Sequence, residues 1–440
     1  MSGQPVSDQQ NSPDVHAPPN VLTDPHTVYT HMREQAAACP MRSLDGSLMW
    51  VVGRHEGVRS VLADPRFAND PASVPGGAPL MQVNAMRNLG LAEELIPYLA
   101  DTLLDNDGAS HSRLRRLVAP AFTARRIFAL RPRIERLTDD LLDGMAEHAE
   151  DGDVDFLSLF AYPLPITVIC ELVGVPMADR PAWLRWTHAL SFEQEKLGET
   201  LGPLVNYTQE LVERRRSRPA DDLISELIRA QDGDRLTDRE LVTMVLSLVI
   251  AGHDTTANFL ANSVWALLTH PDQLALVRAD PELMPQAVHE LLRWCGPVLV
   301  SRMRYVTEDT GLGWAAFQAG DAVMAALSGA NHDPREFPEP ERLDVTRRHR
   351  TRGEAHVSFG AGPHYCLGAG LARHQAEIAL GRLLARWPSL TLAVSPEELN
   401  WQPVSGMRKL ERLPLRLNGG HAADGLPSAA VGPGPGGTLA

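Results

Sequence analysis

Hydrophobic and polar positions recur with a helical period along most of the chain, so the pattern predicts a mainly α-helical fold. Short apolar runs bounded by turn residues replace that period at 47–52, 302–330 and 389–417, which predicts small β-sheets. No internal repeat is visible. The pattern predicts helices over 26–38, 55–62, 130–148, 155–173, 181–195, 202–217, 221–230, 237–270 and 367–387.

The predicted helix over 237–270 is the longest. Thr237 and Glu240 have the spacing of a capping box, and Pro271 marks the other end. At 1.5 Å per residue the helix would extend about 50 Å. Residues 242–250 are apolar on nearly every side, which is typical of a buried helix. We therefore expect this helix to cross the centre of the protein.

A polar turn interrupts this apolar helix at 251–256, where the sequence reads Ala-Gly-His-Asp-Thr-Thr. Glycine and adjacent threonines weaken a helix, and a threonine hydroxyl can bond the carbonyl one turn back. Because such a turn costs stability inside a core, it is commonest at functional sites.

One cysteine stands in a glycine-rich loop over 359–368, just before the last predicted helix. Gly360 and Gly362 permit a tight turn and Pro363 stiffens it. The N-terminus of the next helix would favour a thiolate at Cys366, which suits metal ligation. The alternative is a buried structural cysteine beside a turn.

Composition narrows the class of protein. The chain has 440 residues, 44% of them hydrophobic, and a net charge of −14, which argues against nucleic acid as a partner. Its four cysteines are scattered, so neither a zinc site nor a disulfide framework is indicated, and a reducing cytoplasm fits best. Residues 1–20 are predicted to be a disordered leader without signal-peptide character, and residues 418–440 a disordered Gly/Pro/Ala-rich tail.

Two further groups of charged residues have helical spacing. His111 and Arg115 share one helical face after a turn at 107–111, and the alternative is a solvated basic face. Glu290 and Arg293 are three residues apart between leucines, which indicates a partly buried pair rather than a surface ion pair.

Taken in order, these motifs resemble those of the cytochrome P450 family, in particular its soluble bacterial branch. The matching segments are the loop 359–368, the turn 251–256, the pair Glu290 and Arg293, and Pro-Glu-Arg at 340–342. The resemblance covers residues 21–417 and implies a single catalytic domain with the P450 fold, in which the long central helix crosses a haem.

The resemblance implies haem b as cofactor, with Cys366 as the axial thiolate ligand of the iron. It implies that His111, Arg115, Arg304 and His364 hold the haem propionates, since each can donate to a carboxylate. Around the haem it also places Ala251, Phe359 and Gly368. Behind the haem it implies a structural triad of Glu290, Arg293 and Arg342.

By the same resemblance, Asp254 and Thr255 deliver protons during activation of O2. Electrons would come from a ferredoxin and its NAD(P)H-dependent ferredoxin reductase, because no flavin or iron–sulfur pattern is present. A basic docking patch for that partner is expected, with ordinary solvated charges as the alternative. Its candidate residues are Arg113, Arg116, Arg125, Arg126 and Arg373.

The substrate pocket expected from family position is mostly apolar, which favours a bulky hydrophobic small molecule as substrate. The resemblance implies that the enzyme hydroxylates or epoxidises this substrate to tailor a secondary metabolite. The candidate residues of the pocket are Met86, Leu246, Ile250, Val298, Leu299, Val300, Val404 and Met407. The alternatives are oxidative coupling or another non-hydroxylating oxidation on the same fold, or a non-catalytic haem or ligand-binding protein. We expect a cytoplasmic monomer that binds neither membrane nor nucleic acid.

Overall fold

The structure is a computed structural model. It describes residues 24–42, 47–77, 81–149, 153–192, 196–231, 236–348, 354–402 and 406–417. The leader at 1–20 and the tail at 418–440 lie outside the described residues, so their disorder stays a prediction.

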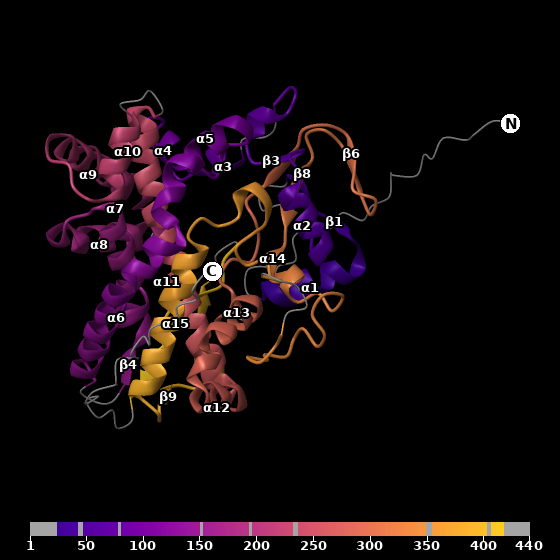
Figure 1. Cartoon of the computed structure of the whole chain (residues 1–440). Helices are drawn as coiled ribbons and strands as arrows, with labels where there is room; N and C mark the ends of the chain where they lie inside the picture. Colours follow the sequence, from indigo (N-terminus) through magenta and orange to yellow (C-terminus); the bar gives the residue numbers. More distant parts are fainter. Residues whose placement is uncertain are drawn as a thin grey trace, which may run out of the picture.

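Helices make up most of the described chain, and Figure 1 shows α6 to α10 gathered on one side with α1, α2 and α14 on the other. The helices are α1 (Pro25–Gln35), α2 (His55–Ala63), α3 (Met81–Asn88), α4 (Pro97–Ala100), α5 (Gly108–Val118), α6 (Ala124–Glu147), α7 (Pro163–Val173), α8 (Arg180–Phe192), α9 (Leu197–Ser217), α10 (Leu223–Gln231), α11 (Asp238–Thr269), α12 (Pro271–Ala279), α13 (Met284–Cys295), α14 (Leu327–Asn331) and α15 (Ala369–Arg386).

The strands are short and form small sheets. One sheet has the order β1-β2-β8-β5-β3, in which β2 and β8 pair in parallel and the other pairs are antiparallel. The others are β4-β12-β9, β10-β11 and β6-β7. The strands are β1 (Ala38–Arg42), β2 (Leu48–Val52), β3 (Phe67–Ala68), β4 (Asp153–Asp155), β5 (Arg304–Val306), β6 (Thr310–Gly311), β7 (Ala316–Phe317), β8 (Ala322–Ala325), β9 (Thr391–Leu392), β10 (Trp401–Gln402), β11 (Lys409–Leu410) and β12 (Pro414–Arg416).

The prediction of a mainly α fold with small β-sheets is thus confirmed. The helix predicted at 155–173 is shorter than expected. Its first part forms strand β4 and one π-helical turn over Leu157–Ala161, and α7 begins only at Pro163. Proline is favoured at the first position of a helix, where its missing N–H costs nothing.

Helix α11 crosses the middle of the molecule, as its apolar pattern predicts. Its capping box is present: Glu240 N donates to Thr237 Oγ1 at 3.1 Å, and Thr237 N donates to Glu240 Oε2 at 2.7 Å. By length and hydropathy α11 could cross a membrane, but 67% of its apolar window is buried inside the protein. Its apolar residues therefore belong to the core.

Two large hydrophobic clusters meet along α11. One joins its C-terminal half to α6, α13 and α15, and the other joins its N-terminal half to α7, α9 and α10. The polar turn at 251–256 lies between the two clusters. This arrangement holds the weakened turn on a rigid helix, which is how a scaffold positions functional groups.

Candidate functional site

A cavity of about 360 Å³ separates the polar turn of α11 from the cysteine loop. Cys366 lines one wall, and Ala251, Gly252 and Thr255 line the wall of α11. The lining is mainly apolar away from the cysteine and includes Leu103, Leu104, Phe122, Ile169, Leu248, Phe259, Val298 and Val300. The two sequence motifs therefore form the two sides of one site.

The cysteine loop is held in shape by its glycines. Gly360 and Gly362 have φ angles of 73° and 69°, a conformation that side chains disfavour. A Cβ on Gly362 would also lie 2.5 Å from the carbonyl oxygen of Leu62, so this position excludes any larger residue. The N–H of Cys366 donates to the carbonyl of Phe359 at 2.9 Å and closes the loop.

The surroundings of Cys366 act on its pKa in opposite directions, and burial, the largest influence, leaves it above the ordinary value. Burial raises the pKa of the thiol, while the backbone N–H groups of Gly368 and Ala369 and the guanidinium of Arg115 lower that pKa. Gly368 is the N-cap residue of α15, so the sulfur also faces the positive end of that helix. The other cysteines, Cys39, Cys170 and Cys295, are free and buried.

On the opposite wall, Thr255 faces the cavity and its Oγ1 donates to the carbonyl of Ala251 at 2.8 Å. Gly252 leaves little room, since a Cβ there would lie 3.2 Å from Ile169 Cγ1. The turn remains helical, so the expected weakening shows as a hydroxyl–carbonyl bond rather than as a break.

Asp254 lies outside the cavity lining. Its carboxylate forms a buried ion pair with Lys409 of β11 and accepts from Asn258 Nδ2 at 3.0 Å, while the hydroxyl of Tyr162 lies at 3.5 Å. Burial, and after it the nearby carboxylate of Asp254, raises the pKa of Tyr162. Sequence reasoning missed Lys409, because nothing near it in the chain relates it to a residue 155 positions away.

The four predicted propionate donors, His111, Arg115, Arg304 and His364, all line the cavity. Three of their buried nitrogens have no hydrogen-bond partner among the described residues, namely His111 Nε2, Arg304 Nε and His364 Nδ1. Buried polar nitrogens without a partner are costly, so their convergence on one cavity points to a polar group that belongs there. A pair of carboxylates, such as haem carries, fits this set of donors.

Asp107 positions these donors and was not singled out from the sequence. His364 Nε2 lies 3.1 Å from Asp107 Oδ1, and the same carboxylate accepts the backbone N–H groups of Asn69 and Asp70. The rings of His111 and His364 lie 4.0 Å apart. Burial lowers the pKa of His111 to about 4, and the positive charge of its neighbours acts in the same direction. A carboxylate against this ring would offset both effects.

The structural triad needs one correction. Glu290 and Arg293 form a fully buried bidentate pair at 2.8 Å, but the third arginine is Arg347, whose Nε lies 3.1 Å from Glu290 Oε1. The prediction of Arg342 is wrong, because its guanidinium is exposed beside Glu339. Only its backbone contributes, since its carbonyl accepts from Arg293 Nη2 at 3.2 Å.

The predicted substrate pocket is partly displaced. Val298 and Val300 line the cavity, whereas Leu246, Leu299, Met86, Ile250 and Met407 do not, and Val404 lies outside the described residues. On α11 the cavity face follows Leu248, Ala251, Gly252 and Thr255, which repeat at helical spacing. Leu246 points instead into the core cluster shared with α7 and α9.

The predicted docking arginines differ in their surroundings. Arg113 pairs with Glu240, Arg126 with Glu226 and Arg373 with Glu354, so their charges are partly compensated. Arg116 on α5 and Arg125 at the start of α6 are exposed. The remaining predicted cofactor contact, Phe359, lines the cavity and packs near Tyr365 and Arg373.

Comparison with known proteins agrees with this geometry. The family profile described as cytochrome P450 matches residues 183–407. Cytochrome P450 107B1 of Saccharopolyspora erythraea is 43% identical over 89% of this chain and 95% of its own length. The 6-deoxyerythronolide B hydroxylase of the same organism is 40% identical over 90% of this chain and 96% of its own length.

Solved structures show the same fold. The cytochrome P450 enzyme CxnD, whose structure is described as that of an enzyme for C–S bond formation in chuangxinmycin biosynthesis, superposes with a TM-score of 0.82 at 34% identity. The match covers 93% of this chain and 98% of that one. The cavity between a cysteine loop and a threonine-bearing helix, the matched profile and these relatives together show that the chain belongs to the cytochrome P450 family of haem-thiolate monooxygenases.

Proposed function

We propose that this protein binds haem b in the described cavity and uses O2 to hydroxylate or epoxidise a bulky, largely apolar small molecule, as a tailoring step of secondary metabolism. The observation that carries the proposal is one cavity with Cys366 on one wall, Thr255 on the other and, in its lining, three buried nitrogens without a hydrogen-bond partner among the described residues. The hydroxylase activity named for one relative supports the same class of reaction.

His111, Arg115, Arg304 and His364 would hold the two propionates, and Cys366 would ligate the iron. The bound haem would supply activation of O2 by electron transfer at its iron. The protein supplies orientation, a dry surface and protons. Arg115 Nη2 already donates to the carbonyl of Tyr365 at 2.7 Å, so it links the propionate site to the cysteine loop.

Thr255 is the proposed proton relay inside the cavity: it would accept a proton on Oγ1 and give up its own hydrogen once the hydroxyl turns away from Ala251. Its hydrogen is committed to the carbonyl of Ala251, which leaves the lone pairs of Oγ1 directed at other donors. Asp254 is the next acid along the helix, outside the cavity, and would resupply protons from the buried polar group around Tyr162 and Lys409. In this proposal Thr255 acts at the reacting atoms and Asp254 acts through it.

The cavity lining supports a hydrophobic substrate. Leu103, Leu104, Ile169, Leu248 and Phe259 supply apolar surface. Val298 and Val300 continue this surface beside the cofactor site. We propose a substrate held mainly by apolar contact, with position rather than hydrogen bonding deciding which atom is oxidised.

We propose that electrons come from a ferredoxin and its NAD(P)H-dependent reductase in the cytoplasm, and that the enzyme works as a monomer. Arg116 and Arg125 support this part, because they are exposed and would attract an acidic partner, and Arg125 lies at the start of α6, which packs against the helix that follows Cys366.

The absorption spectrum of the reduced, CO-bound protein tests the proposal. We expect the red-shifted Soret band of thiolate ligation, and we expect Cys366→Ala to abolish it. Cys295→Ala is the matched control, because that thiol is free and buried away from the cavity lining. A wild-type protein that takes up haem without the band would remove the basis of the monooxygenase assignment.

One observation favours a second candidate, oxidative coupling. A structural neighbour at a TM-score of 0.82 is described as an enzyme of C–S bond formation. Turnover under labelled O2 separates the two reactions, since hydroxylation and epoxidation incorporate the label into the product and coupling does not. Spin-state changes on binding a metabolite library would first supply the substrate.

A further inference from the structure

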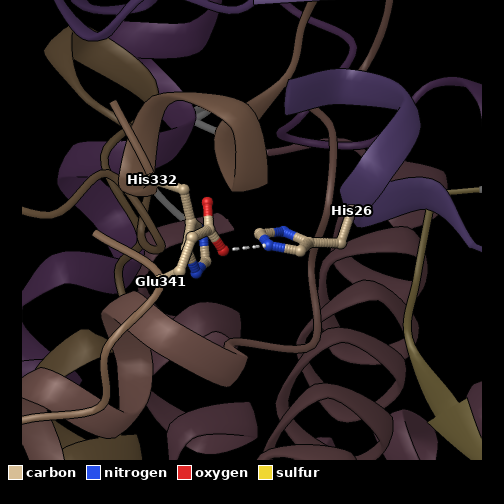
Figure 2. A group of neighbouring side chains, drawn as sticks. All are labelled: His26, His332 and Glu341. Atoms are coloured by element: carbon tan, nitrogen blue, oxygen red, sulfur yellow. Dashed lines mark hydrogen bonds and ion pairs between the residues drawn. The ribbon is translucent and has the colours of Figure 1, made fainter. Parts of the chain in front are cut away.

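Three potential metal ligands meet outside the haem site (Figure 2). His26 lies on α1, His332 caps the end of α14, and Glu341 belongs to the proline-rich crossing that follows. Their candidate ligand atoms all lie within 4.8 Å of one another. None of the three lines the catalytic cavity.

His332 is prepared to act as a neutral nitrogen ligand. It is 3% exposed, and its Nδ1 lies 3.0 Å from the carbonyl oxygen of Ser328. A carbonyl can only accept, so Nδ1 carries the hydrogen and Nε2 holds a free lone pair in the neutral ring. Burial lowers the pKa of His332 well below its ordinary value. Fixing the tautomer through the other ring nitrogen is how proteins orient ligating histidines.

His26 and Glu341 complete the group. His26 Nε2 lies 2.7 Å from Glu341 Oε2, and the rings of His26 and His332 meet edge to face with centroids 4.1 Å apart. At present a proton joins His26 to the carboxylate. A divalent cation can take the place of that proton, because it attracts the same lone pair and the same negative charge.

We propose that His26 Nε2, His332 Nε2 and the carboxylate of Glu341 form a three-ligand site for a divalent transition-metal ion, with Zn²⁺ as its representative. Two imidazoles and one carboxylate are a ligand set that Zn²⁺ takes with a further position open to water. Ligands of one such ion, at about 2.0–2.2 Å from the metal, lie about 3.3–3.5 Å apart. The half-exposed His26 and exposed Glu341 can adjust to that spacing.

Nearby positive charges do not exclude a cation. The hydrogen bond with His26 is the main cause that lowers the pKa of Glu341, and the guanidinium groups of Arg33 and Arg293 act in the same direction. Arg33 is paired with Glu34, and Arg293 with Glu290. The site therefore gains the charge of Glu341 without facing an uncompensated arginine.

The position suggests a structural role. The carbonyl of Glu341 accepts from Trp294 Nε1 at 2.8 Å, and the carbonyl of Asn331, next to His332, accepts from Arg293 Nη1 at 2.9 Å. An ion at this point would fasten α1 to the segments that enclose the buried Glu290–Arg293 pair. It would stabilise the folded state by binding it in preference to the unfolded chain.

A second group, His289, Glu354 and His356, also has ligand atoms close together. Glu354 is already engaged by Tyr365 and Arg373, so its oxygens are committed to the cysteine-loop side of the protein. This group carries no proposal and serves as a control below.

Calorimetric titration of the chelator-treated holoprotein, free of any affinity tag, with ZnCl₂ tests the site. We expect one ion per chain, and we expect His26→Gln and Glu341→Gln each to weaken binding at least tenfold. His31→Gln, on the exposed face of the same helix, and His289→Gln, in the second group, should bind Zn²⁺ as the wild type does. Zn²⁺ should also raise the melting temperature of the wild type and not that of His26→Gln.

The absence of stoichiometric binding to the wild type would overturn the proposal. So would unchanged affinity in either His26→Gln or Glu341→Gln, since the three residues would then be an ordinary ion pair beside a buried histidine. The measurement uses no turnover, and the CO-bound spectrum of each variant shows separately whether the haem site is intact.

Discussion

Asp254 has a proposed role in proton supply to Thr255 and also belongs to a buried ion pair that bears on the stability of the fold. It stands one position before the threonine of the cavity wall, yet its carboxylate is turned away from the cavity and paired with Lys409 inside the protein. A buried carboxylate needs such a partner, because an uncompensated charge in the interior is costly. The pair therefore keeps a charged acid next to Thr255, with Lys409 of β11 compensating its charge.

Lys409→Met should destabilise the protein by about 3–5 kcal/mol, because it leaves the Asp254 charge buried without its cation. Urea unfolding of the holoprotein measures this loss. Asp254→Asn in the same chain should restore part of the stability, since a neutral amide needs no cation. Strictly additive effects of the two substitutions in a double-mutant cycle would show that the pair does not contribute.

At the scale of elements, the irregular crossing after α14 holds the third arginine of the buried network. Arg347 reaches Glu290, which is completely buried, and also donates to the carbonyls of Pro338 and Arg342. Arg342 faces solvent. The side chain of Arg347 therefore ties the crossing to α13, and the side chain of Arg342 does not.

Arg347→Ala should cost about 1.5–3 kcal/mol and weaken haem retention, because it removes charge-assisted hydrogen bonds to Glu290, which keeps its pair with Arg293. Arg342→Ala, five residues away, should change stability by no more than about 0.5 kcal/mol, as a surface substitution does. Denaturant unfolding and the rate of haem transfer to an acceptor protein measure the difference. Equal losses in both variants would contradict the assignment.

These elements show what could be read from the sequence. Helix α11 was predicted over 237–270 and is observed over Asp238–Thr269, because its capping box and Pro271 mark its ends. The cysteine loop was equally clear, since its glycines are required by backbone geometry. The sequence does not distinguish Arg342 from Arg347, because an irregular crossing has no repeating hydrophobic pattern that shows which side chain points inward. The displaced residues Leu246 and Ile250 have a related cause, since an all-apolar helix does not reveal which face borders a cavity.

At the scale of the whole molecule, the charge distribution bears on the redox partner. The chain has a net charge of −14, so an acidic ferredoxin would be repelled except at a local basic surface. Arg116 on α5 and Arg125 and Phe128 on α6 are exposed and are the proposed candidates for such a surface, which we call the α5–α6 patch. It lies beside α15, since Phe128 and His374 are neighbours and Ile127 packs against Gly370.

Reversing both charges of the α5–α6 patch, Arg116→Glu with Arg125→Glu, should raise the KM for an acidic ferredoxin at least tenfold and flatten the dependence of turnover on salt. Electrostatic attraction sets the association rate, and salt screens it. Arg185→Glu on α8 is the control. It reverses the charge of another exposed arginine outside the patch and should leave the ferredoxin KM unchanged. Because Arg115 and Cys366 are untouched, the CO-bound spectrum should stay that of the wild type. If the double variant accepts electrons at the wild-type KM and with the wild-type salt dependence, the ferredoxin docks on another face.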